Sequence, residues 1–362
     1  MVASYRARRA GRHMTAAAAL LSCALSSSIP ASGQAAGPTS TPAPTGPPAA
    51  AAAPKWYDTI RIKGYVQLDA LFPEGSSTFG HVSNFRVRRA RPTIQAMVDP
   101  RTMVQIQFDV STGKALSGGS TALVTDTFAE RAVPGFGHVR AGHMLIPFSR
   151  EIIEDNAAVR SPLELSYVGE RLALAERDIG LLVEAPMTEA RPYGVSVGLY
   201  NGQGFRTADA NSNKTVIGRA TARLGSSLQC GLAGMLGSYR ATASSPARDY
   251  DRHVLVVGAR VRATRAATVT GELYNARFVD DPNVPTRPAR FTGGYLLLET
   301  AIPSIRSTPW LRYQRTYGDL DYRSFDVGWR YDYTSAERVT LEYDIVRGPS
   351  NDGFGARWTL FF

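Results

Sequence analysis

Arginine side chains offer the clearest chemistry in this sequence. The run from Phe85 to Arg91 contains four arginines, and the last three, Arg88, Arg89 and Arg91, are closely spaced. A guanidinium group stays charged at physiological pH and donates paired N–H bonds to carboxylates and phosphates. Residues two apart on a strand project to the same side, so Arg89 and Arg91 are expected to share one surface. The run therefore predicts an anion-binding surface.

Further basic residues lie on segments with strand-like patterns, and each has two open interpretations. A basic side chain on such a segment either attracts anions or forms a structural ion pair with a carboxylate. The anion-binding set contains, besides the three arginines above, Arg61, Lys63, Arg140, Arg219 and Arg223, with Arg260, Arg262 and Arg312 as further lining positions.

The segment from Pro147 to Arg177 has weak alternation and more acidic than basic residues. A link this long in a compact fold is usually functional. We expect it to form a constriction, with an acidic surface facing the basic one across a transverse field. The constriction residues proposed from the sequence are Glu151, Glu154, Asp155, Arg160 and Glu164.

The sequence gives little support for a catalytic or metal-binding site. The histidines are scattered, there is no GxSxG or HExxH motif, and the glycine-rich pieces are not followed by a helix. Asp280 and Asp281 fall in an expected loop, where adjacent acids are usually solvated. We therefore expect no catalytic residue, no metal ligand set and no cofactor. The arginines also lack a nucleic-acid-binding motif, so no nucleic-acid partner is expected.

The elements that must position the arginines have a period of two residues. Between Ile60 and Ala70 the apolar side chains alternate with polar ones such as Arg61 and Gln67. The same pattern recurs around residues 104–110 and 324–332. A soluble sandwich also alternates, so the repetition along the whole chain, rather than any one segment, favours a membrane barrel. Aromatic residues expected at its lipid interfaces are Trp56, Tyr193, Trp310, Trp329, Tyr331, Tyr333, Tyr343 and Trp358.

The candidate strands and their links give the fold class. Short turns alternate with longer polar links such as residues 71–84, 202–213, 240–251 and 278–290. We predict an all-β, 16-stranded antiparallel transmembrane β-barrel whose third external loop folds inward. Strand starts are expected near residues 59, 85, 103, 123, 137, 178, 193, 214, 227, 252, 268, 291, 308, 322, 337 and 353.

The N-terminal part of the chain predicts export from the cytoplasm. Residues 1–34 have a basic stretch followed by a short apolar stretch, which is the pattern of a cleaved signal peptide. Residues 35–57 are rich in alanine and proline and are expected to be a disordered periplasmic segment. Residues 58–362 are expected to be the barrel, located in the bacterial outer membrane. Cys230 would be the one cysteine of the mature chain, so no intramolecular disulfide is expected.

The last strand ends on Phe362, with apolar residues at every second position before it. This ending resembles the assembly signal of outer-membrane proteins. The resemblance implies recognition by the barrel assembly machinery, and outer-membrane lipid and lipopolysaccharide as surroundings.

Several motifs resemble, in order, those of the phosphate-selective porin O/P family over most of residues 58–362. They are Phe85–Arg91, Val139–Gly142 leading to Pro147–Ser149, Arg160–Ser161, Glu176–Gly180 and Asn201–Gly204. The resemblance implies a homotrimeric sixteen-stranded porin for passive diffusion of small anions such as phosphate.

Two departures from that family leave other functions open. The predicted mature chain has few lysines, namely Lys55, Lys63, Lys114 and Lys214, and the predicted constriction is acidic. A general-diffusion porin with weak anion preference is therefore the alternative. An outer-membrane barrel enzyme and a soluble exported β-sandwich that binds a ligand are further hypotheses, although no nucleophile and base pair supports the enzyme.

Overall fold

The computed structural model describes residues 55–74, 82–111, 122–154, 159–172, 176–204, 212–241, 248–278, 289–347 and 352–362. By its internal contacts the chain divides into two units, residues 1–58 and 59–362. The predicted signal peptide (1–34) and most of the predicted disordered segment (35–57) lie outside the described residues. Lys55 to Asp58, the described end of the first unit, include the start of the short 3-10 helix η1 (Trp56–Thr59).

The second unit is an antiparallel sheet with 18 strands in its described part and few helices. The alternation of apolar and polar residues dictates this structure, because it suits a strand with one apolar and one polar face. The strands are β1 (Arg61–Lys63), β2 (Tyr65–Pro73), β3 (Asn84–Ala90), β4 (Thr93–Asp99), β5 (Thr102–Val110), β6 (Ala122–Val133), β7 (Gly137–Leu145), β8 (Arg177–Ala185), β9 (Tyr193–Tyr200), β10 (Thr215–Leu224), β11 (Leu228–Ala241), β12 (Arg248–Arg262), β13 (Ala267–Phe278), β14 (Ala289–Thr300), β15 (Ser307–Gly318), β16 (Tyr322–Asp332), β17 (Glu337–Arg347) and β18 (Gly353–Phe361).

Strands that are adjacent in sequence pair with each other from β4 to β18, and β18 pairs with β2. In the described part of the sheet β2 also pairs with β3, and β1 pairs with β4. Gly64 separates β1 from β2 at a crowded point, since an added Cβ would lie 2.5 Å from the carbonyl oxygen of Arg91. Pro92 lies between β3 and β4 and has no N–H to donate to the ladder.

The predicted strand starts agree closely with the observed ones. The largest difference is at β12, which begins at Arg248 and not near residue 252. The breaks at Gly64 and at Arg91–Pro92 divide two predicted strands into four short ones. No helix in the described part is long and apolar enough to cross a membrane.

The exposed face of the sheet is apolar and the buried face is largely polar, which is the reverse of a soluble sandwich. On β9, Val195, Val197 and Leu199 are about half exposed, whereas Ser196 is buried. On β16, Phe325 and its apolar neighbours are exposed, while Asp326 is fully buried. Apolar side chains that face outward and polar ones that face inward are typical of membrane barrels.

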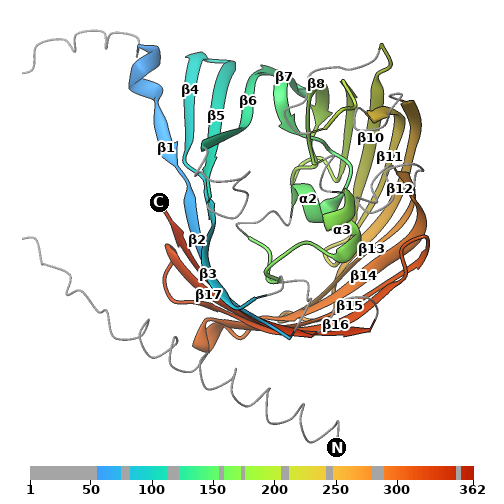
Figure 1. Cartoon of the computed structure of the whole chain (residues 1–362). Coiled ribbons are helices and arrows are strands. Elements are labelled where there is room, and N and C mark those ends of the chain that lie inside the picture. Colours follow the sequence, from blue (N-terminus) through green and yellow to red (C-terminus); the bar gives the residue numbers. More distant parts are fainter. Residues whose placement is uncertain are drawn as a thin grey trace, which may run out of the picture. The chain divides into compact units, whose positions relative to one another are not determined.

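The strands curve around the segment from Ile146 to Glu176, which joins β7 to β8 and is called here the inner segment (Figure 1). It contains the short helices α2 (Arg150–Ile153) and α3 (Tyr167–Leu172). A hydrophobic cluster packs the inner segment against the sheet through residues such as Phe148, Ile152 and Leu172, with Val256 and Leu297 among those of the wall. The short helix η3 (Pro303–Ile305) lies between β14 and β15.

Candidate functional site

The inner segment corresponds to the constriction predicted between Pro147 and Arg177. Its two ends meet at the sheet, because the N–H of Ile146 donates to the carbonyl of Glu176 at 2.9 Å. Between these ends it lies on the polar face of the sheet, where its backbone and side chains bond to strand residues. Two groups of contacts, one near its start and one near its middle, hold it on the sheet.

The first group is the Glu272 anchor, formed by the Glu272 carboxylate on β13. The hydroxyl of Ser149 donates to Glu272 at 3.0 Å, and the backbone N–H groups of Arg150 and Glu151 donate at 2.7 and 3.1 Å. Glu272 is 3% exposed. A buried carboxylate needs such donors to offset its lost hydration. The start of α2 is therefore fixed on the wall.

Two tyrosines complete the Glu272 anchor. The hydroxyl of Tyr274 donates to the Glu272 carboxylate at 2.8 Å, and that of Tyr295 donates at 3.2 Å. None of these three residues was predicted from the sequence. The usable signal was the spacing of Glu272 and Tyr274, two apart on one strand, which predicts that both face inward.

Glu151 joins the two helices of the inner segment. Its carboxylate accepts bonds from the Ser166 backbone N–H at 2.5 Å and from the Ser166 hydroxyl at 2.7 Å. Burial raises the pKa of Glu151 to about 7, and the nearby Glu272 charge adds to the rise while Arg312 opposes it. This predicted constriction residue therefore changes its charge near neutral pH.

The middle of the inner segment is bound to strands β15 and β17. The backbone N–H of Leu163 donates to Glu342 at 2.5 Å, and Arg312 donates to the carbonyl oxygen of Glu164 at 2.9 Å. Arg312 also forms an ion pair with Asp326 at 2.7 Å. Arg312, expected to line a pore, therefore holds the inner segment in place.

The second group of contacts is the arginine cluster around the carboxylate of Glu164. Within 4 Å of this carboxylate, in the described part of the chain, lie the guanidinium groups of Arg86 (3.9 Å), Arg88 (2.6 Å), Arg89 (3.1 Å), Arg160 (3.4 Å) and Arg357 (2.8 Å). Burial alone would raise the pKa of Glu164, but Arg88, Arg89 and Arg357 hold it well below its ordinary value. Glu164 is therefore a carboxylate that remains charged.

A β-bulge explains why consecutive arginines face the same side. Gln67 pairs with Arg89 and Leu68 pairs with Val87, so Arg88 is an extra residue in the ladder. Such an insertion breaks the alternation. Arg89 and Arg91 share the inner side as predicted, and the bulge adds Arg88 to them.

Three of the other predicted anion-binding residues form ion pairs. Arg91 lies 2.8 Å from Asp109, Arg140 lies 2.5 Å from Glu130, and Arg219 contacts Glu154. Arg61 and Lys63 are exposed on β1, and Arg223 is half-buried on β10. Arg160 and Glu164 belong to the arginine cluster, whereas the predicted constriction residue Asp155 lies outside the described residues.

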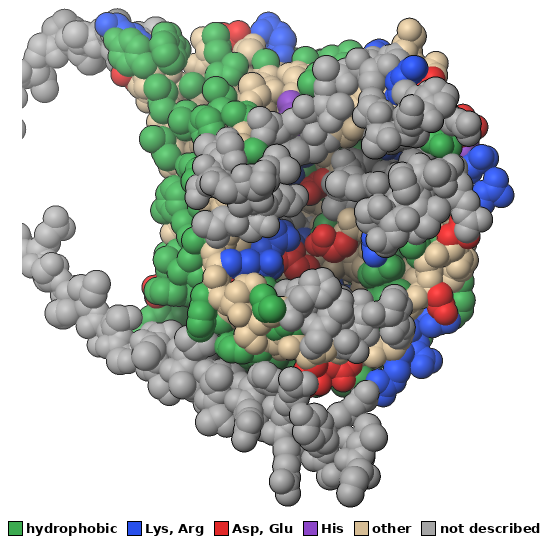
Figure 2. Space-filling model, in the orientation of Figure 1, with side chains coloured by type: hydrophobic (Ala, Val, Ile, Leu, Met, Phe, Trp, Pro, Cys, Tyr) green, Lys and Arg blue, Asp and Glu red, His purple; other side chains and the backbone are tan. Residues whose placement is uncertain are grey.

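Figure 2 shows basic and acidic side chains side by side within the opening of the sheet, with apolar side chains on the outer flank. The sequence predicted an acidic surface and a basic surface on opposite sides of a gap. The described contacts differ from this, because Glu154 and Glu164 touch the basic residues directly. Close approach lets each buried charge exchange its hydration for a counter-charge.

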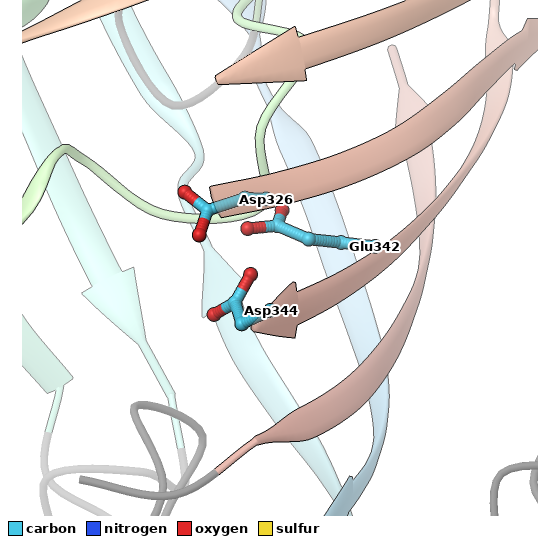
Figure 3. A group of neighbouring side chains, drawn as sticks. All are labelled: Asp326, Glu342 and Asp344. Carbon is cyan, nitrogen blue, oxygen red and sulfur yellow. The ribbon is translucent and has the colours of Figure 1, made fainter. Parts of the chain in front are cut away.

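Three buried carboxylates, Asp326, Glu342 and Asp344, project toward one another from β16 and β17 (Figure 3). Their nearest oxygen atoms lie within 4.8 Å of one another, which is close enough for a shared cation. Arg312 already forms ion pairs with Asp326 and Glu342, and Gln314 donates to Asp326 at 2.5 Å. The geometry thus assigns this group a structural role around Arg312.

The predicted interface aromatics lie on both faces of the sheet. Tyr193, Trp329 and Trp358 are exposed on the outer face. The prediction for Trp310 is wrong, since this residue is 3% exposed and faces inward with Arg312. Its indole lies over Gly328, the residue directly opposite on β16, where an added Cβ would lie 2.2 Å from the ring. A glycine partner provides the room for the indole on the inner face.

No family model matches the sequence, and no curated protein sequence is similar to it. Solved structures do match the fold. The anion-selective porin from Comamonas acidovorans has a TM-score of 0.63 and 13% identity, and the match covers 84% of this chain and 99% of that one.

Two further structures give the same result. OmpF of Salmonella typhi, in complex with daunomycin, has a TM-score of 0.62 and 11% identity over 84% of this chain and 97% of that one. OmpT of Vibrio cholerae, an outer membrane protein in its trimer form, has a TM-score of 0.58 and 14% identity over 84% and 99%. The chain therefore has the fold of the outer-membrane porins.

Proposed function

We propose that this protein is an outer-membrane porin, exported with a cleaved signal peptide and folded as a closed sixteen-stranded barrel. The count follows when β1 and β2 are taken as one strand broken at Gly64, and β3 and β4 as one broken at Arg91–Pro92. The pairing of β18 with β2 supports closure. The exposed apolar face and the buried polar face support a lipid environment outside and water inside.

The channel conducts small anions by passive diffusion. The observation that carries this proposal is the arginine cluster on the inner face, where the guanidinium groups outnumber the carboxylates of Glu164 and Asp69 that pair with them. Fixed positive charge in a narrow passage attracts anions and repels cations. The fold shared with an anion-selective porin supports the same function. Phosphate is the proposed solute, on the resemblance of the sequence motifs.

A general-diffusion porin with weak anion preference is the second candidate. It is favoured by the ion pairs of Arg91, Arg140 and Arg219, each of which places a carboxylate beside a predicted anion-binding residue. Paired charges present a weaker net field to a passing ion than unpaired ones. The two candidates differ in selectivity, not in architecture.

The proposed assembly is a homotrimer in contact with lipid and lipopolysaccharide. OmpT, which shares the fold, has a trimer form. Trp358 and Phe362 are exposed at the last strand, where Phe362 is the proposed recognition point for the barrel assembly machinery. The same exposed aromatics suit the lipid interface.

Single-channel recording in a planar bilayer tests these proposals. A salt gradient measures the ion preference, and phosphate is added against a chloride current. Current steps that favour chloride and are blocked by phosphate support a phosphate-selective porin. Weak preference without block supports the general-diffusion porin, and the absence of steps contradicts both.

The double variant R89Q/R91Q tests the named residues. We expect a lower anion preference with conductance retained, because two positive charges of the inner face are removed while the strands stay paired. The matched control is R131Q, since Arg131 lies on the same sheet but is exposed and pairs with Asp99 at 3.3 Å. A reversal potential that is the same in the double variant and in the wild type contradicts the assignment.

A further inference from the structure

The arginine cluster contains more positive than negative charge. Five guanidinium groups surround Glu164, and among the described residues the other carboxylate in contact with them is Asp69, which pairs with Arg86 at 3.2 Å and with Arg357 at 2.7 Å. Glu170 also lies near, and burial together with the Glu164 charge raises its pKa, which favours its neutral form. The cluster therefore attracts additional negative charge.

Two N–H donors of the cluster are buried and lack an acceptor among the described residues. They are the Nε atoms of Arg89 and Arg160. Arg89 is 7% exposed and Arg160 is 9% exposed. A buried donor without an acceptor has lost its hydrogen bonds to water and has formed no new one, which costs free energy. An oxygen atom of a bound anion would provide the missing acceptor for these two N–H groups.

The Glu164 side chain already occupies the centre of the cluster in the manner of a bound anion. One of its oxygens accepts from Arg88 at 2.6 Å and from Arg357 at 2.8 Å. The other accepts from Arg89 at 3.1 Å and from Arg160 at 3.4 Å. This two-oxygen pattern is the one by which guanidinium groups bind free carboxylates and phosphates.

The backbone around Glu164 is held independently of its side chain. Arg312 donates to the carbonyl oxygen of Glu164, the N–H of Leu163 donates to Glu342, and Arg357 donates to the carbonyl oxygen of Leu163. The Glu164 carboxylate is thus able to leave the arginines by side-chain rotation while the inner segment stays in place.

We propose that the arginine cluster is an oxyanion-binding site that Glu164 occupies as a tethered counter-ion. A free oxyanion competes with the Glu164 carboxylate for Arg88, Arg89, Arg160 and Arg357. The ligand class is an anion with at least two acceptor oxygens, such as a phosphate or a carboxylate, and excludes chloride. This inference deepens the proposed anion channel and rests on it, because the channel brings anions to the site.

The test uses the full mature chain purified in detergent, with inorganic phosphate and acetate titrated in separate calorimetric experiments. The variant E164Q keeps the shape of the side chain and removes its charge. We expect E164Q to bind phosphate at least about tenfold more tightly than the wild type, since the internal competitor is weakened. Tighter binding of phosphate than of acetate identifies an oxyanion with more than two oxygens as the preferred ligand, and the reverse order identifies a carboxylate.

The matched control is E189Q. It removes the same charge from an exposed turn between β8 and β9. We expect wild-type affinity for this variant. R160Q, measured in parallel, is expected to weaken phosphate binding several-fold, which keeps the proposal testable if E164Q does not fold. Equal phosphate affinity in the wild type, E164Q and R160Q overturns the proposal.

Bilayer recording separates this inference from the proposed function. If the wild type conducts and phosphate blocks E164Q at a lower concentration than the wild type, both are supported. If the wild type conducts and E164Q responds to phosphate as the wild type does, the proposed role of Glu164 as a tethered counter-ion is wrong, whereas the proposed channel function is supported. If no protein conducts but E164Q still binds phosphate more tightly in calorimetry, the binding site stands and the channel is wrong.

Discussion

The Glu272 anchor and the arginine cluster hold the same segment with opposite polarity. At the anchor, the carboxylate belongs to the wall and the inner segment supplies the donors from Ser149, Arg150 and Glu151. At the cluster, the inner segment supplies the carboxylate of Glu164 and the wall supplies most of the donors. Each donor named at the anchor has an acceptor, whereas the Nε atoms of Arg89 and Arg160 at the cluster have none among the described residues. The difference separates a structural attachment from a site that can accept a solute.

The largest expected effect is from E272A, which removes the Glu272 anchor. Ser149, two backbone N–H groups and two tyrosine hydroxyls lose a buried acceptor, so we expect a loss of about 3–5 kcal/mol in the free energy of unfolding. Urea unfolding in detergent, followed by tryptophan fluorescence, measures this loss. Release of α2 from the wall should also raise the single-channel conductance. Unaltered unfolding and conductance would show that the anchor is dispensable.

The next effect is a pH dependence that involves Glu151. Its pKa is raised to about 7 in the folded protein from an ordinary value of 4.5, so the folded state binds the proton more tightly. The resulting stability is fully present below pH 4.5 and is lost as the pH rises to about 7, and its size is roughly 3 kcal/mol.

The variant E151Q measures this contribution. It resembles the protonated form, so the fall in stability between pH 5 and pH 8 should be smaller than in the wild type. Urea midpoints at the two pH values give the comparison, and other titrating groups cancel between the two proteins. The same pH dependence in both proteins would contradict the role of Glu151.

The smallest expected effect supplies a baseline for charges outside both sites. Asp321 is 72% exposed at its side chain and pairs with Arg315 at 3.0 Å. Because solvent screens an exposed ion pair, D321N should change the free energy of unfolding by about 0–1 kcal/mol. Urea unfolding measured as for E272A checks this. A loss as large as that of E272A would mean that burial does not set the difference between the sites.

The strand pattern was predictable from the sequence because its cause is local. Along β16, Phe325 and Val327 alternate with Ser324 and Asp326, and the side-chain direction of each follows from its position alone. The extent of the inner segment was also predictable, since its alternation is weak between two strongly patterned strands. The predicted inward side of Arg89 and Arg91 follows from the same rule.

The contacts between distant residues were not predictable. Glu272 and Ser149 are far apart in the sequence, and no local pattern indicates that they meet. Trp310 was assigned to the lipid interface because tryptophan is common there, but the space above Gly328 lies on the inner face. The bulge at Arg88 depends on the register between two strands, which the sequence of one strand does not determine.

The bulge at Arg88 determines how many arginines β3 presents on the inner face of the sheet. With Arg88 as an inserted residue, β3 carries Arg86, Arg88 and Arg89 on one side, although a regular strand would divide them between two faces. Deletion of Arg88 would restore a regular ladder in which Arg86 and Arg89 still face inward, so this face of the strand would lose one positive charge while every other side chain kept its side. Insertion or deletion of a bulge residue thus offers a way to change the charge on one face of a strand by one side chain at a time.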